Sequence, residues 1–172
     1  MRILSRNLFR LATAGVVIVA VMAGPAPAKS AKTTKITVTV SLTSSQRILE
    51  QVGRGGVITY GWNQLSGTAS TASGDVTVQI LGNVEYTNGS GPFFGFLTLK
   101  FASLSTLGLH MEGTATLRKE GTTALKAKLR VIGGNAAFTG ASGTGSFTGE
   151  RKAALGSPID IKITINVRGI SN

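Results

Sequence analysis

The side chains with the chemistry of acids, bases or metal ligands are few in this sequence and lie far apart. His110 is the single histidine, two positions before Glu112. Both fall on the polar side of an alternating segment, where we expect a histidine exposed to water. Asp75, Glu85 and Asp160 share polar faces in the same way. General acid–base catalysis needs such groups held inside a pocket, so the sequence assigns no catalytic residue.

The residues or motifs that several other kinds of reactive site require are absent from the sequence. The sequence contains no cysteine, which excludes disulfides, cysteine metal sites and a lipoprotein anchor. No spacing of histidine and carboxylates matches a metal site, so we predict neither a metal nor a cofactor. No G-x-S-x-G turn precedes a helix, and no glycine-rich loop continues into the G-K-[ST] of a phosphate-binding loop.

A group of large apolar side chains suggests binding of an apolar molecule. Ligand pockets combine an apolar and aromatic lining with a few polar tips, and such side chains recur in four segments of this chain. The same side chains also suit the core of a small barrel that fills its own interior, and this alternative stays open. The residues predicted to bind a ligand are Tyr60, Trp62, Tyr86, Phe93, Phe96 and Met111.

These residues lie in segments whose polar–apolar alternation predicts β-strands. The alternation places Ile or Val at every second position in residues 159–167, and residues 44–56 lack it, which predicts an irregular connection or a short strand there. With no amphipathic helix, the strands predict one all-β domain, an eight-stranded antiparallel β-barrel. The predicted strands are residues 35–43, 57–68, 75–87, 92–101, 109–117, 124–132, 144–152 and 159–167.

Residues 131–149 are rich in glycine, with two phenylalanines among the glycines. This stretch resembles a signature of the allene oxide cyclase and dirigent-like β-barrels, and Ala136 stands where that signature usually has a third glycine. Residues 86–95 resemble a hairpin of secreted bacterial members. The resemblance implies a barrel of lipocalin-like architecture that acts through the shape of its pocket, and it assigns no catalytic residue. The matching positions are Gly133, Gly134, Phe138, Ala141 and Gly143.

The first 28 residues have the three parts of a secretory signal peptide. Three arginines precede an apolar run at residues 11–24, and an A-x-A site follows at residues 26–28. We predict cleavage after Ala28, an exposed lead-in at residues 29–34 and a barrel domain at residues 35–172. The protein is then secreted, to the periplasm, the cell envelope or the outside. An uncleaved membrane anchor is the alternative.

The charge of the chain bears on its partners. Loss of residues 1–28 removes three arginines and lowers the formal net charge from +11 to +8. A basic protein associates weakly with anionic envelope polymers, and the basic residues are spread along the chain, so no specific nucleic-acid site is predicted. An outer-membrane barrel is disfavoured because such barrels need two aromatic girdles, whereas the aromatics here are clustered.

These observations favour a non-catalytic scaffold that binds a small apolar molecule, lipid-like or polyketide-like, in a barrel cavity. Two alternatives remain. A cyclase or isomerase using the same cavity would be favoured by a polar cluster inside the barrel. A structural envelope protein would hold anionic polymers on an outer face formed by Lys126, Lys128, Arg130 and Lys162. Residues 93–101 are apolar on both faces, which predicts a homo-oligomer interface.

Overall fold

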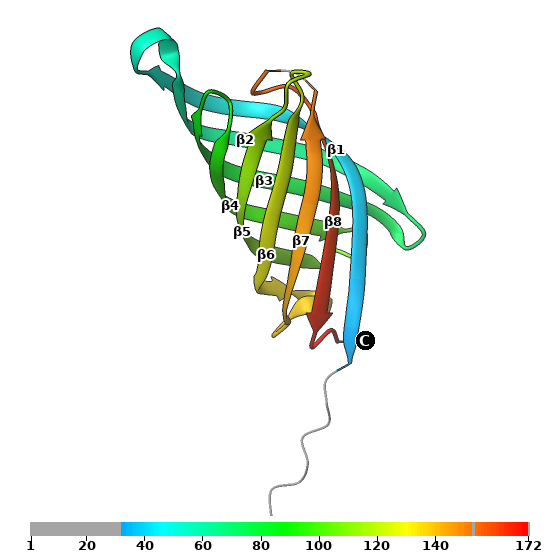
Figure 1. Ribbon diagram of the computed structural model, residues 1–172. Coiled ribbons are helices and arrows are strands. Elements are labelled where there is room, and N and C mark those ends of the chain that lie inside the picture. Colours follow the sequence, from blue (N-terminus) through cyan, green and yellow to red (C-terminus); the bar gives the residue numbers. More distant parts are fainter. Residues whose placement is uncertain (1–31, 153, 172) are drawn as a thin grey trace, which may run out of the picture. The chain divides into compact units, whose positions relative to one another are not determined.

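The chain forms a closed antiparallel barrel of eight strands, as the sequence predicted (Figure 1). The computed structural model describes residues 32–152 and 154–171, so the predicted signal peptide lies outside the described residues. No helix in this described part is long and apolar enough to cross a membrane. The elements are β1 (Thr33–Val52), η1 (Arg54–Gly56), β2 (Ile58–Thr71), β3 (Gly74–Thr87), β4 (Gly91–Phe101), β5 (Thr106–Leu117), β6 (Thr123–Asn135), η2 (Ala136–Phe138), β7 (Ser142–Arg151) and β8 (Ile159–Arg168).

Strand β1 closes the ring, because its first half pairs with β8 and its second half with β2. It starts inside the predicted lead-in and continues through residues 44–52, so of the two predicted alternatives for this segment the strand is right, as a continuation of β1, and the irregular connection is wrong. A β-bulge between Ser44 and Gln46 explains the missing alternation. Leu42 points inward before the bulge, whereas after it Leu49 packs on the core and Ile48 is 69% exposed. The extra residue exchanges the two faces of the strand.

The aliphatic faces of the strands fill the barrel interior. In β8 every second side chain is buried, from Ile159 to Val167, and the intervening Asp160 and Lys162 face outward. Burial of each such side chain contributes about 1.5–3 kcal/mol, so these inward columns hold the barrel together.

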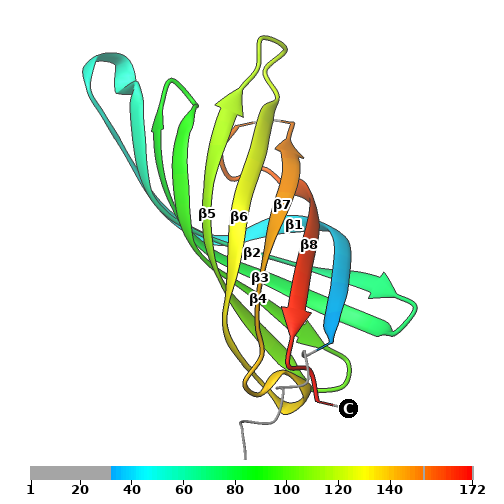
Figure 2. The ribbon, with the colours of Figure 1, turned by 60° about the horizontal axis from the view of Figure 1, so that its bottom comes forward.

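The two ends of the barrel are closed differently. At the lower end in Figure 1, η2 follows β6 and buries Phe138, whose ring lies 5.1 Å from that of Phe101. Figure 2 turns this end forward and shows the β6–β7 turn beside the end of β8. The upper end carries the connections β1–β2, β3–β4, β5–β6 and β7–β8. A functional opening therefore has to be sought at the upper end.

The glycine-rich motif forms the closed end. A Cβ on Gly134 would overlap Phe138 and the Thr106 carbonyl, and a Cβ on Gly143 would overlap the Asn166 carbonyl on β8. Both glycines thus permit close backbone approach. Ala136, where the family signature usually has glycine, adopts a left-handed backbone conformation with φ 49°.

Ala136→Gly should stabilise the protein, because a non-glycine residue in the left-handed region is strained. The free energy of unfolding should rise by about 0.5–1 kcal/mol, which allows for the cost of the larger entropy of glycine in the unfolded chain. Thermal unfolding would show a rise of about 2–4 °C. Ala137→Gly, one residue along in η2 without a positive φ, is the control and should lower stability. A lower unfolding temperature in both variants would contradict the backbone strain assigned to Ala136.

An outer apolar stripe crosses strands β1 to β4. Register pairs Ile48 of β1 with Trp62 of β2. Trp62 and Phe94 then lie on either side of Asn83, and Leu81 pairs with Phe96. Phe94 and Phe96 are each 49% exposed, whereas their neighbour Phe93 is buried inside. Strand β4 is therefore apolar on both faces, and its outer face is left uncovered in the single chain. We call Ile48, Trp62, Leu81, Phe94 and Phe96 the outer stripe.

We expect copies of the protein to associate through the outer stripe, and Phe94→Asp to yield a soluble monomer. A carboxylate at the centre of an apolar contact would lose its hydration without compensation. Light scattering compares the masses in solution. Thr98→Asp, on the same outer face of β4 beyond the stripe, is the control and should keep the parent's mass. A Phe94→Asp variant of the parent's mass would show that this stripe is not the interface.

Candidate ligand-binding site

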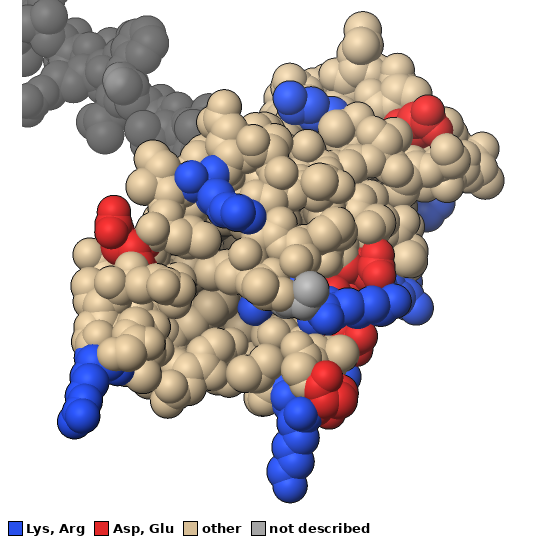
Figure 3. Space-filling model, turned by 90° about the horizontal axis from the view of Figure 1, so that it is seen from above, with Lys and Arg blue, Asp and Glu red and all other residues tan. Residues whose placement is uncertain are grey.

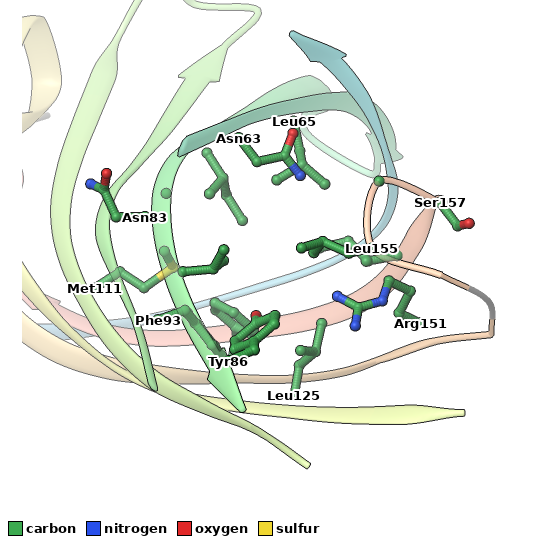
Figure 4. A pocket seen from close by; sticks show the side chains of 16 residues that line it. Asn63, Leu65, Asn83, Tyr86, Phe93, Met111, Leu125, Arg151, Leu155 and Ser157 are labelled. Atoms are coloured by element: carbon green, nitrogen blue, oxygen red, sulfur yellow. The ribbon is translucent and has the colours of Figure 1, made fainter. Parts of the chain in front are cut away.

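A cavity of about 50 Å³ lies inside the barrel at its upper end (Figure 4). Aliphatic and aromatic side chains of the strands form most of its wall, and Leu155, Gly156 and Ser157 of the β7–β8 connection contribute to its lining. A space of this size holds only a few water molecules. The interior is thus largely filled by its own side chains, with an opening left at this end. The side chains central to the site are Asn63, Leu65, Ile80, Tyr86, Phe93, Met111, Leu125, Phe147, Arg151 and Leu155.

Arg151 is the charged residue of the cavity wall. The inward positions of β7 are Gly143, Gly145, Phe147, Gly149 and finally Arg151, so strand alternation alone turns Arg151 inward at the upper end. Its side chain is only 5% exposed, and its Nη2 donates a hydrogen bond to the Thr123 hydroxyl at 3.2 Å. The guanidinium carbon lies 5.8 Å from the centre of the Tyr86 ring, within the range of a cation–π contact.

Tyr86 lines the cavity near the end of β3 and is 3% exposed. Burial raises the pKa of its phenol above the ordinary value, and the charge and hydrogen bond of Arg151 oppose that rise. The net direction is upward, so at neutral pH the phenol keeps its proton and acts as a hydrogen-bond donor.

Asn63 brings an amide to the cavity from β2. The residue is 4% exposed, and its Oδ1 accepts a hydrogen bond from the Ser44 hydroxyl at 2.6 Å. Figure 4 shows the Asn63 side chain across the cavity from Tyr86, with its amide turned toward the space between them. The bulge in β1 bears on this hydrogen bond. Ser44 is the last residue of β1 before the bulge exchanges the inner and outer faces of the strand.

A second arginine lies at the rim of the cavity. After the bulge, Arg47 pairs with the inward-facing Asn63, so its side chain belongs to the barrel side of β1. A Cβ on Gly156 would overlap the Arg47 guanidinium, which places Arg47 directly against the β7–β8 connection. The upper end therefore carries positive charge both at its rim and inside.

The structure brings together three of the six residues predicted to bind a ligand. Tyr86, Phe93 and Met111 line the cavity, and the ring of Phe93 stacks on Phe147 at 5.8 Å. Their binding of a ligand stays a prediction.

The other three, Tyr60, Trp62 and Phe96, lie outside the cavity. Register pairs them with the outward-facing Glu85, Asn83 and His110, so the barrel wall separates them from the cavity. Both faces of these strands carry large apolar side chains, so their sequence could not show which face points inward.

His110 lies half-buried on the outer face, with its Nδ1 3.7 Å from Glu112 Oε1 and its ring edge-to-face with Phe96. In the described part of the chain, no group of three or more histidine and carboxylate side chains is placed to hold a metal ion.

Sequence reasoning missed two polar residues of the cavity wall, Asn63 and Arg151, and the buried Thr123 whose hydroxyl accepts a hydrogen bond from Arg151. One signal was present for Arg151, since it continues the column of alternate positions that contains Phe147. No comparable signal marks Asn63, because its inward position depends on the ring of strand pairings.

Comparisons with known proteins give a likeness of fold and no family. No protein-family model matches the chain, and no curated protein matches it significantly. Among solved structures, the chain is similar to the pterocarpan synthase dirigent protein GePTS1. The TM-score is 0.46 and the sequence identity 11%, over 84% of this chain and 90% of that chain. The likeness concerns the barrel fold, and no activity or substrate follows from it.

Replacing Tyr86 by phenylalanine should change how stability depends on alkaline pH. Because the folded-state pKa of Tyr86 is raised, the unfolded chain loses this proton first, and stability falls as pH rises above about 10. The fall has a slope of up to about 1.4 kcal/mol per pH unit and is absent from Tyr86→Phe. Denaturant unfolding from pH 8 to 11.5 measures the difference. Two parallel curves would contradict a raised pKa.

Proposed function

We propose that the protein is a scaffold that binds a small apolar molecule at the upper end of its barrel. The observation that carries this proposal is the cavity, which has an apolar wall and a few polar groups at defined places. Ligand sites share this composition, and the mouths of β-barrels are a common place for them. The glycine-rich motif, similar to that of allene oxide cyclase and dirigent-like barrels, supports a function that depends on the shape of the pocket.

The size of the cavity sets a condition on this function. Pockets for drug-sized ligands measure roughly 300–1,000 Å³, well above the volume found here. Leu155 is the side chain whose displacement enlarges the space most directly, because it comes from a connection and not from a strand (Figure 4). A ligand of more than a few atoms must therefore replace Leu155 in its contact with the core.

A cyclase or isomerase acting in the same cavity is the second candidate. The polar cluster of Asn63, Tyr86, Thr123 and Arg151 inside the barrel favours it, since hydrogen-bond donors in a dry pocket stabilise negative charge that develops on a substrate oxygen. A scaffold without turnover would use the same donors only to orient its ligand. Measured turnover of an apolar substrate is what separates the two candidates.

The outer face of β6 to β8 offers a further role. Register aligns Lys126 and Lys162 on either side of Thr148, with Lys128 and Arg130 further along β6. We propose weak binding of anionic envelope polymers there, in keeping with the export expected from residues 1–28. Contacts of exposed charges are screened by salt, so we expect this binding to weaken at modest salt. Figure 3, which views the molecule from above, shows acidic side chains beside some of the Lys and Arg side chains on that side.

Binding of an apolar molecule can be measured at Met111, whose side chain lies in the cavity wall and is 1% exposed. We expect 1-octanol to shift the ¹³C-methyl NMR signal of Met111, assigned with a Met111→Leu variant. Leu125→Phe adds volume to the cavity wall and should weaken binding about tenfold or more, at a stability cost of about 1–3 kcal/mol.

Leu117→Phe is the matched control, because Leu117 is 44% exposed at the end of β5 and should not affect binding. If saturating 1-octanol leaves the Met111 signal of the parent unmoved, the binding function is wrong and the outer basic face becomes the leading candidate.

A further inference from the structure

Two carboxylates flank an exposed aromatic ring on the outer face of β1 to β3. Register pairs Glu50 of β1 with Tyr60 of β2, and Tyr60 with Glu85 of β3. Both glutamates are exposed, and Tyr60 is 45% exposed. Neighbouring strands lie about 4.8 Å apart, so the two glutamates project from backbone positions about 9.6 Å apart. We call Glu50, Tyr60 and Glu85 the acidic row.

Two ammonium groups with the same spacing lie on the outer face of β6 to β8. Register pairs Lys126 of β6 with Thr148 of β7, and Thr148 with Lys162 of β8. All three side chains are exposed. The two lysines are again two strands apart, so their backbone positions are also separated by about 9.6 Å. We call Lys126, Thr148 and Lys162 the basic row.

The charges of the two rows are not balanced within one chain. Among the described residues, no ion pair includes a glutamate of the acidic row or a lysine of the basic row. Other carboxylates on the surface do have basic partners, as Glu150 has in Arg118 at 3.0 Å. Like charges that flank one side chain repel each other, and opposite charges at the same spacing relieve this repulsion in both rows.

We propose that the acidic row of one copy binds the basic row of a second copy. The equal spacing lets both carboxylates meet both ammonium groups at once, and the lysine stems then pack over the Tyr60 ring. The outer stripe lies beside the acidic row, since Trp62 is two residues from Tyr60 on the same face of β2, so the same contact covers it. Contact of the stripe with its own copy would instead oppose carboxylates with carboxylates.

This contact is heterologous, because it joins two different faces of the chain. The centres of the two rows lie on β2 and β7, three strands apart in the closed ring. One copy therefore offers its acidic row to one neighbour and its basic row to another, and association continues beyond the dimer until a ring closes or a filament forms. The anionic polymers proposed above for β6 to β8 compete with the second copy for the basic row.

Two charge-reversed variants test this contact by light scattering. Glu50→Lys/Glu85→Lys reverses the acidic row, and Lys126→Glu/Lys162→Glu reverses the basic row. Each variant alone should be a monomer at a concentration at which the parent associates, because like charges then oppose each other across the contact. An equimolar mixture of the two variants should recover the parent's mass, because each row again meets a row of opposite charge.

Asp75→Lys/Glu120→Lys is the matched control, because it reverses two exposed carboxylates outside the acidic row and should keep the parent's mass. Circular dichroism checks that both charge-reversed variants are folded. A parent that stays monomeric up to millimolar concentration would overturn the proposal, as would a mixture of folded variants that stays monomeric. If Lys126→Glu/Lys162→Glu alone keeps the parent's mass, the basic row is not the partner surface, and the outer stripe contacts its own copy.

Discussion

Closure of the hydrogen-bonded ring through β1 is the constraint on which the rest of the molecule depends. One strand of 20 residues pairs with β8 along its first half and with β2 along its second, so the barrel has no free edge there. Once the ring is closed, strand alternation decides for every residue whether it points inward or outward. The bulge in β1 is part of this solution, because it turns Leu49 toward the core while the strand bends.

The closed ring also explains why polar groups gather at one end of an otherwise aliphatic interior. The lower end is filled by Phe138 and Phe101, whose rings are in contact. At the upper end the inward positions of β2, β3 and β7 hold Asn63, Tyr86 and Arg151. A buried guanidinium costs several kcal/mol of desolvation, which is partly offset by its contacts with Thr123 and Tyr86. A buried charge of this kind is weak evidence for stability, and it is consistent with the binding function proposed above.

The sequence predicted the fold better than the site, and the reason is physical. Strand alternation is local, so the columns of Ile and Val in β8 were visible without any structure, as were the eight strands. The position of a side chain relative to the cavity depends on pairing across the ring. Trp62 and Phe96 looked like pocket residues because they are aromatic, yet register turns them outward. The inner positions of Ser44 and Arg47 could not be predicted, because a bulge of one residue brings both side chains to the same face, where regular alternation would put them on opposite faces.

The central claim is that the upper cavity holds an apolar molecule. Native mass spectrometry of the protein isolated from its own cells, with solvent extraction of any bound compound, tests this claim most directly. The account predicts a complex heavier than the chain by one defined small molecule, and an extract containing one apolar compound in equal molar amount. A bare chain mass and an empty extract would contradict the account and indicate a barrel filled only by its own side chains.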